Sequence, residues 1–130
     1  MRDIKFRGKR ADNGQWVYGY LIKDCDDNKF YITNTRAIYH EVNPDTIGQY
    51  TGLKDINNKE IYEGNIVLIS MSMIYGKPIE QNCKVWFEER LSSFVCNWGN
   101  NPPVRIGSFC NTAFEVIGNI YDNPGLVKND

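Results

Sequence analysis

The sequence predicts a mainly β protein with little helix, built as a small β-barrel or as packed antiparallel sheets. Aromatic residues make up 13% of the chain, and aromatic side chains favour strands over helices. Short apolar runs alternate with turn residues at intervals of about 8 to 12 residues, which is typical of barrels and packed sheets. Because no stretch shows a helical repeat of apolar residues, we expect short strands throughout. By analogy with known small barrels, residues 64–95 are expected to form an SH3-like segment.

The chain has the size and composition of one globular domain. Its 130 residues are 42% apolar and 24% charged, which is enough to bury a core without disulfides or metals. A turn at residues 43–46 marks a lobe boundary. We therefore expect one domain over 1–130, with an N-terminal lobe of strands at 1–48 and a barrel-like lobe at 49–130. The net charge of −1 gives no overall field for nucleic acid, so such binding requires a local patch.

No segment has the pattern of an export signal or a membrane span. The first ten residues are charged throughout, and no apolar run approaches the roughly 18 to 20 residues that cross a bilayer. We therefore expect a cytoplasmic protein without a membrane partner.

The first predicted strand carries alternating apolar and basic residues. Ile4 and Phe6 alternate with cations, which predicts a strand at residues 3–8 with its basic side chains on one face. Those cations either contact phosphates or form the charged outer face that an edge strand needs. The acidic residues among them favour the second interpretation. The candidate nucleic-acid contacts are Lys5, Arg7, Lys9 and Arg10.

An aromatic strand follows a predicted hairpin. The Asn-Gly pair at 13–14 is a strong hairpin signal, so residues 16–22 should return antiparallel beside the first strand. Alternation then places Trp16, Tyr18 and Tyr20 on one face. Exposed rings in that arrangement would form a base-stacking platform, whereas buried rings would form a layer of the core. We expect burial, because exposure of three rings is costly.

The acidic turn at residues 24–28 resembles the start of a calcium-binding loop. However, Lys29 stands where the sixth position of such a loop needs Gly, and Thr35 stands where the twelfth needs Glu. The cysteines lie far apart and His40 has no partner at a recognisable spacing, so we expect no metal site, no cofactor and reduced thiols. The cysteines are Cys25, Cys83, Cys96 and Cys110.

Residues 49–69 hold the densest structural signals of the second lobe. A turn at 55–58 contains residues that accept turn conformations. The apolar run at 66–69 predicts a central strand that is buried on both faces. We expect the turn at Asn57-Asn58 to be exposed and six side chains near it to be mainly buried: Tyr50, Leu53, Ile61, Tyr62, Ile66 and Leu68.

The remaining chain predicts further strands and one long connection. Gly and Pro after residue 71 favour the connection. The adjacent glutamates at 88–89 belong to a polar turn, not to a catalytic carboxylate pair. Gly118 inside the last strand marks a bulge or a close backbone approach. The expected elements are a connection at 71–82, strands at 84–88 and 91–98, a loop at 97–103 and a strand at 114–121.

Blocks along the whole chain resemble the YopX family of small proteins encoded by bacterial phages and prophages. The clearest are Gln-Tyr-Thr-Gly-Leu-Lys-Asp at 49–55 and Lys-Glu-Ile-Tyr-Glu-Gly at 59–64. Asn58 and Asn65 depart from the Gly and Asp that the family usually has, although Asn tolerates positive φ almost as well as Gly. The resemblance implies fold, phage or prophage origin and a bacterial host cell, but no assigned activity. The other matching blocks lie at 1–10, 13–19, 41–48 and 115–124.

The function predicted from these features is that of a non-enzymatic accessory protein. The chain has no Gly-rich phosphate loop, no Ser-His-Asp or Cys-His arrangement and no metal cluster, so we expect no catalytic residue and no small-molecule substrate. The main hypothesis is an adaptor that binds another macromolecule, and the alternative is a small β-barrel that binds nucleic acid.

Protein contacts or self-association are expected at strand edges and loops. The strand at 114–121 would leave an open edge that Glu115 alone guards, and such edges recruit another chain. The candidate protein contacts are Trp98, Ile117 and Tyr121.

Overall fold

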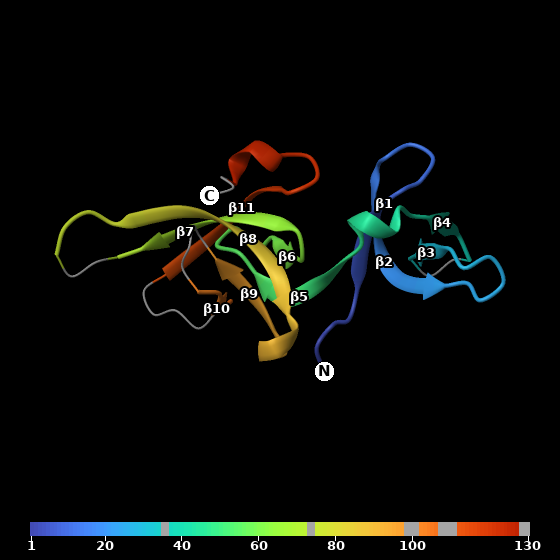
Figure 1. Cartoon of the computed structure of the whole chain (residues 1–130), viewed down its shortest axis with the longest axis horizontal. Coiled ribbons are helices and arrows are strands. Elements are labelled where there is room, and N and C mark those ends of the chain that lie inside the picture. The colour runs from blue at the N-terminus through green and yellow to red at the C-terminus, as the bar shows by residue number, and fades with distance from the viewer. Residues whose placement is uncertain (35–36, 73–74, 98–101, 107–111, 128–130) are drawn as a thin grey trace. The chain divides into compact units, whose positions relative to one another are not determined.

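The protein consists of two compact units, residues 1–52 and 53–130 (Figure 1). The computed structural model describes residues 1–34, 37–72, 75–97, 102–106 and 112–127. These residues form strands and three short 3₁₀ helices, so the mainly β prediction is confirmed. Within them no helix is long and apolar enough to cross a bilayer. The helices are η1 (Pro44–Thr46), η2 (Glu89–Leu91) and η3 (Pro124–Leu126).

The strands of the first unit follow the order β4-β3-β2-β1-β5 in an antiparallel sheet, and β6 comes next to β5 in that order. The predicted hairpin is present, and Gly14 adopts the positive φ of 72° that its turn requires. β1 lies between β2 and β5. The prediction that the first strand is a charged edge strand is therefore wrong. The strands are β1 (Phe6–Lys9), β2 (Trp16–Lys23), β3 (Phe30–Thr33), β4 (Tyr39–Glu41) and β5 (Gly48–Lys54).

The core of the first unit lies on one face of this sheet. Ile32 and Val42 are each 1% exposed, and a Cβ built on Gly8 would lie 3.2 Å from the Cβ of Val42. Gly19 of β2 has a φ of 153°, and a Cβ there would lie 2.2 Å from the carbonyl oxygen of Thr33. The backbones of β2 and β3 therefore approach more closely than any side chain at this position allows.

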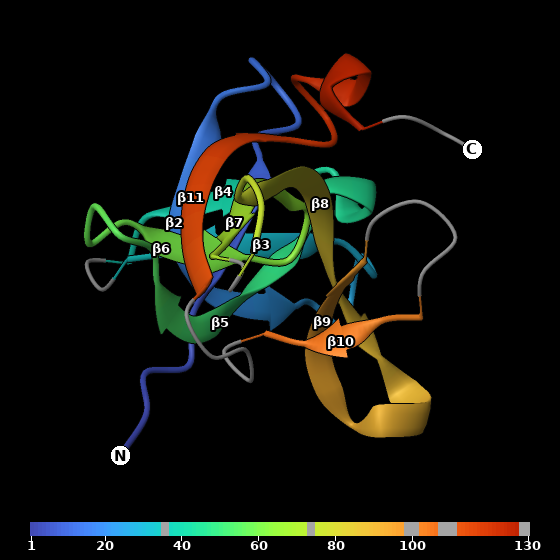
Figure 2. The same ribbon diagram turned by 90° about the vertical axis from the view of Figure 1, so that its left-hand side faces the viewer.

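The second unit contains an antiparallel sheet in the order β10-β9-β8-β7-β11 (Figure 2). Residues 53–54 at the end of β5 also belong to this unit, and a turn connects them to β6. The expected barrel is not observed, because neither sheet closes on itself in the strands that the structure describes. The strands are β6 (Glu60–Tyr62), β7 (Asn65–Met71), β8 (Ile79–Glu88), β9 (Ser93–Asn97), β10 (Val104–Arg105) and β11 (Thr112–Asn119).

The strand predicted at 66–69 lies inside this sheet, between β8 and β11. Ile66, Val67 and Ile69 are at most 1% exposed. Leu68 is only half-buried, so the expected burial on both faces is wrong at that residue. Leu53, which was expected to be buried, is 40% exposed. The predicted burial is confirmed for Tyr50, Ile61, Tyr62 and Ile66.

The connection predicted at 71–82 is shorter in the structure. β7 continues to Met71, which pairs with Ile79 at the start of β8. The first part of β8 is polar because its side chains are mostly exposed, so it lacks the apolar residues that would have signalled a strand. The expected strand at 91–98 begins only at Ser93, since η2 occupies the predicted turn.

Asp55 organises the turn between β5 and β6. The carboxylate of Asp55 is buried, with 8% of the residue exposed. Its Oδ1 accepts hydrogen bonds from the backbone N–H groups of Asn57 and Lys59, both at 2.8 Å. Asn58 lies in the same turn at φ 65° and is exposed, as predicted. The turn therefore forms around a buried charge.

The same carboxylate connects the turn to β11. Oδ2 of Asp55 accepts a hydrogen bond from the N–H of Val116 at 2.8 Å. Next to it, the N–H of Ile56 donates to the carbonyl of Phe114 at 3.0 Å. Burial alone would raise the pKa of Asp55, but the three backbone N–H groups and the charge of Lys59 hold this pKa below its usual 3.8.

Asn65 makes a second connection to β11. It is 4% exposed, its Oδ1 accepts from the N–H of Tyr62 at 2.7 Å, and its Nδ2 donates to the carbonyl of Gly118 at 3.1 Å. The register shifts between Val116 and Gly118, and a Cβ on Gly118 would lie 2.6 Å from Oδ1 of Asn123. The predicted bulge at Gly118 is confirmed, whereas the group that approaches Gly118 closely is the side chain of Asn123 and not a backbone.

We predict that Asp55→Asn lowers the free energy of unfolding by about 2 to 3 kcal/mol at pH 7, because one amide oxygen cannot accept all three hydrogen bonds. The pKa of Asp55 is lower in the folded than in the unfolded state, so its contribution is present above about pH 4 and is lost as the pH falls through the folded value. Urea denaturation at several pH values measures both effects. Asp3→Asn, at an exposed position, is the control, and identical pH profiles for wild type and Asp55→Asn would contradict the assignment.

We predict that Gly19→Ala destabilises the first unit by about 1 to 3 kcal/mol, since the added methyl must displace the backbone of β3. Thermal denaturation followed by circular dichroism measures the loss. Gly125→Ala is the matched control, because a Cβ there meets nothing within 4 Å. Equal melting temperatures for the two variants would show that β3 adjusts without cost.

Candidate functional site

One face of the first unit's sheet presents three exposed tyrosines. Alternation along β2 places Trp16, Tyr18 and Tyr20 on the same face. Tyr20 lies opposite Thr33 of β3, and Thr33 lies opposite Tyr39 of β4, so Tyr39 shares this face. Tyr18, Tyr20 and Tyr39 are 48%, 56% and 55% exposed. We call these three residues the tyrosine face.

The expectation that the aromatic residues of β2 form a core layer is wrong for two of the three. Trp16 is half-buried, whereas Tyr18 and Tyr20 remain exposed. The reason is that the apolar core, with Ile32 and Val42, lies on the other face of the sheet. The phenol hydroxyl lets a tyrosine ring face water at a lower cost than a purely apolar ring.

Basic side chains from β1 lie beside this face. Arg7 is opposite Tyr18 and Lys9 is opposite Trp16. The guanidinium carbon of Arg7 is 4.5 Å from the centroid of the Trp16 ring, and Nζ of Lys9 is 5.5 Å from it. Nζ of Lys5 is 5.1 Å from the centroid of the Tyr50 ring. These are cation–π distances, so three of the four predicted basic contacts lie next to aromatic rings.

Arg7 and Arg10 differ from the solvated side chains that were expected. Arg7 is only 5% exposed, and its guanidinium lies against the ring of Trp16. Nε and Nη2 of Arg10 bind the two carboxylate oxygens of Asp12 at 2.9 and 2.7 Å. This hydrogen bonding to Arg10 holds the pKa of Asp12 below its usual value. The charge of Arg10 is therefore largely compensated locally.

A polar pocket of about 350 Å³ lies near Tyr39. Its charged groups form ion pairs: Arg10 with Asp12, and Glu41 with Lys29 at 3.7 Å. A catalytic pair needs two titratable groups that different environments hold apart in pKa, and mutual ion pairing does not supply this. The pocket is lined by Arg10, Ala11, Asp12, Tyr39, His40 and Glu41.

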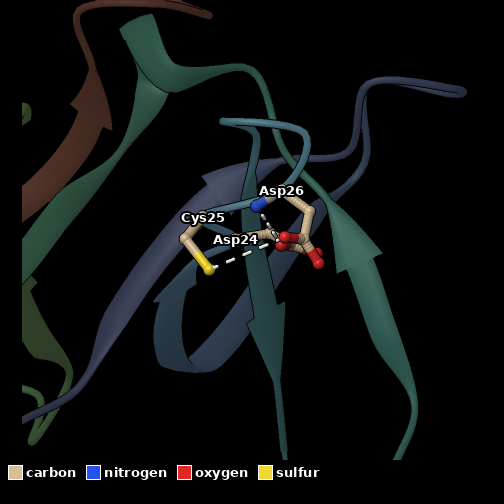
Figure 3. Close-up of side chains that lie close together, drawn as sticks. All are labelled: Asp24, Cys25 and Asp26. Atoms are coloured by element: carbon tan, nitrogen blue, oxygen red, sulfur yellow. Dashed lines mark hydrogen bonds between the residues drawn. The ribbon is translucent and has the colours of Figure 1, made fainter.

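The acidic turn at 24–28 is a polar turn in the structure, as predicted. Figure 3 shows Asp24, Cys25 and Asp26, whose potential ligand atoms lie within 4.8 Å of one another. The N–H of Asp26 donates to Oδ1 of Asp24 at 2.8 Å, and Asn28 closes the turn with a φ of 64°. The need to form this turn accounts for the clustering.

The cysteines that the structure describes are free thiols, as expected. Cys25 is exposed, whereas Cys83 and Cys96 are buried. The hydrogen bond to Cys96, together with burial, raises the pKa of the Cys83 thiol. Cys110 lies outside the described residues. Both buried thiols pack in the apolar core of the second unit.

The predicted protein contacts lie in the second unit. Trp98 is outside the described residues. Tyr121 is half-buried, and its Cε2 is 3.0 Å from the position that a Cβ on Gly64 would occupy, so its ring packs against its own chain. Ile117, at the bulge, is half-buried.

The edge of β11 is partly covered by its own chain, contrary to the expectation that only the charge of Glu115 protects it from pairing with another chain. Phe114 and Val116 bond to Ile56 and Asp55 on the edge that faces away from β7. The turn between β5 and β6 therefore occupies backbone groups that a second chain would need.

The sequence contained only weak signals for the structural roles of Tyr39 and Asp55, which were not predicted from it. Tyr39 stands in a stretch without clear periodicity, so nothing assigned it to a face. Asp55 was interpreted as a turn residue, which it is, but its bond to Val116 joins residues that are 61 positions apart. Only the paired strands reveal such a contact.

Comparison with known proteins supports a single assignment over nearly the whole chain. No curated protein matches it. The fold is similar to the crystal structure of protein EF1440 from Enterococcus faecalis, with a TM-score of 0.58 and 21% sequence identity over 98% of this chain and 100% of that chain. The model of the YopX protein family matches residues 5–128. The chain therefore belongs to the YopX family.

Proposed function

We propose that this chain is a non-enzymatic accessory protein of a phage or prophage, which acts in the cytoplasm of the bacterial host by binding another macromolecule through its tyrosine face. The exposure of Tyr18, Tyr20 and Tyr39 on one face of a sheet is the observation that carries this proposal. Exposed clusters of large rings are costly in water and mark interaction sites. Tyr, Trp and Arg are also the residues that dominate binding energy at interfaces.

The charged groups of the two units support binding more than catalysis. In the described part of the chain, the polar pocket holds ion pairs whose members neutralise each other, Arg10 with Asp12 and Glu41 with Lys29. Asp55, the buried carboxylate of the second unit, bonds to backbone N–H groups and is occupied by a structural role. Family membership supports the phage or prophage origin.

We predict that the double variant Tyr18→Ala/Tyr20→Ala loses binding to its partner by at least about tenfold, because two rings leave the contact surface. Isothermal titration of fractionated host and phage lysates measures the loss. Tyr75→Ala is the matched control, since Tyr75 is 90% exposed and belongs to the second unit. Equal binding of wild type and double variant, or turnover of any substrate, would contradict the proposal.

Self-association is a separate proposal that concerns β11. Ile117 lies beyond the groups that Asp55 and Ile56 occupy, so a second chain could contact its side chain. We expect Ile117→Lys to reduce any dimer that sedimentation velocity detects at micromolar concentration, because the charge would be desolvated in the contact. A strict monomer in the wild type would remove this contact and leave the tyrosine face as the proposed surface.

A further inference from the structure

We propose that the partner of the tyrosine face is a single-stranded nucleic acid, whose bases stack on Tyr18 and Tyr20 and whose phosphates lie near Lys5 and Lys9. This inference rests on the proposed function above and names the class of partner. It is carried by the arrangement of rings on β2 and cations on β1, which the sheet register places on the same face.

The rings are spaced as a stacking platform requires. β2 is an interior strand that pairs with β3 on one side and with β1 on the other, so its side chains stand away from the edges of the sheet. Tyr18 and Tyr20 are two residues apart, which separates their Cα atoms by about 7 Å along an extended strand. Tyr39 adds a third ring two strands away, about 10 Å from Tyr20 across the sheet. Open sheets with exposed aromatic rings on their inner strands hold unpaired bases in this way.

The charges around the rings match a polyanion. Arg7 and Lys9 occupy the β1 positions opposite Tyr18 and Trp16. Glu41 of β4 is the acidic residue among the strand positions that the register places on this face. Its carboxylate is 3.7 Å from Nζ of Lys29. The β1 side of the face is therefore locally positive although the whole chain carries a net charge of −1.

The side of the face at β3, away from β1, has an acidic group beside it. The hydroxyl of Tyr31 donates to Oδ2 of Asp27 at 2.6 Å, and this hydrogen bond raises the pKa of Tyr31 to about 12. The negative charge of Asp27 would repel phosphates from that end. A bound strand is thus expected to lie with its bases on β2 and its backbone toward β1.

Single strands fit this surface better than a duplex does. In a duplex the flat faces of the bases are stacked on each other, so rings on a flat sheet cannot reach them. An apolar protein surface matches this face less well than a nucleic acid does. Ile22 is the aliphatic side chain that β2 places there beside its aromatic residues, and the neighbouring strand β1 carries cations.

The test is fluorescence anisotropy with labelled 12-nucleotide single strands of DNA and RNA and with a duplex of the same sequence. We expect micromolar binding of a single strand and at least about tenfold weaker binding of the duplex. With two or three phosphate contacts at about 0.7 per contact in the logarithmic salt slope, the dissociation constant should rise about tenfold between about 50 and 200 mM salt.

Variants assign the roles of the individual side chains. Tyr18→Ala and Tyr20→Ala should each weaken binding about tenfold, while Tyr20→Phe, which keeps the ring, should retain it. Lys9→Gln should reduce the salt slope by about 0.7. Circular dichroism establishes that each variant is folded. The matched controls are Tyr75→Ala and Lys77→Gln, at exposed positions of the second unit, and they should leave binding unchanged.

The outcomes separate this inference from the proposed function. If no oligonucleotide binds while a nuclease-treated protein fraction binds wild type and not Tyr18→Ala/Tyr20→Ala, the nucleic-acid inference is overturned and the proposed function stands. If oligonucleotides bind equally to wild type and to both tyrosine variants, the face is not the contact surface and both fail. If nothing binds in either experiment, both also fail.

Discussion

The close approach of β2 and β3 at Gly19 is the constraint on which the first unit depends. Because the site of a Cβ on Gly19 lies 2.2 Å from the carbonyl oxygen of Thr33, the two backbones pack directly and the sheet has no room for a layer of side chains there. The register pairs Leu21 with Ile32 and Tyr20 with Thr33, so Ile32 lies on the core face and the tyrosines of β2 lie on the opposite face. The candidate binding surface thus follows from the register of the sheet and from the face on which the core lies.

The second unit depends on a different device, a buried carboxylate. Asp55 accepts hydrogen bonds from a turn at one oxygen and from Val116 of β11 at the other. A single side chain therefore holds both the turn and the last strand, and it does so in the charged state because backbone donors replace water. Asn65 does the same with an amide, whose Nδ2 donates to Gly118. These two polar residues of the family's signature blocks thus have structural roles, in a turn and in its connection to β11.

The two units differ in what they offer to a partner. The second unit uses its polar signature residues internally and covers part of its outer strand with its own turn. The first unit leaves rings and cations on a sheet face, with Arg7 and Lys9 next to Trp16. Cations over aromatic rings hold the rings in place and keep positive charge near them. These contacts fix the cations of β1 next to Trp16, at the side of the tyrosine face.

Residue types and their spacing alone determined the first two strands of the first unit, the hairpin at 13–14, the polar turn at 24–28, the bulge at Gly118 and the family. These features follow from local chemistry, because period-two alternation and turn residues act within a few positions. Tertiary structure alone decided which face of β2 meets the core. Alternation assigns Tyr18 and Tyr20 to one face without saying whether that face is buried, and tyrosine is compatible with either. The interior place of β1 and the bond from Asp55 to Val116 were likewise decided by pairings between distant segments, which no local pattern encodes.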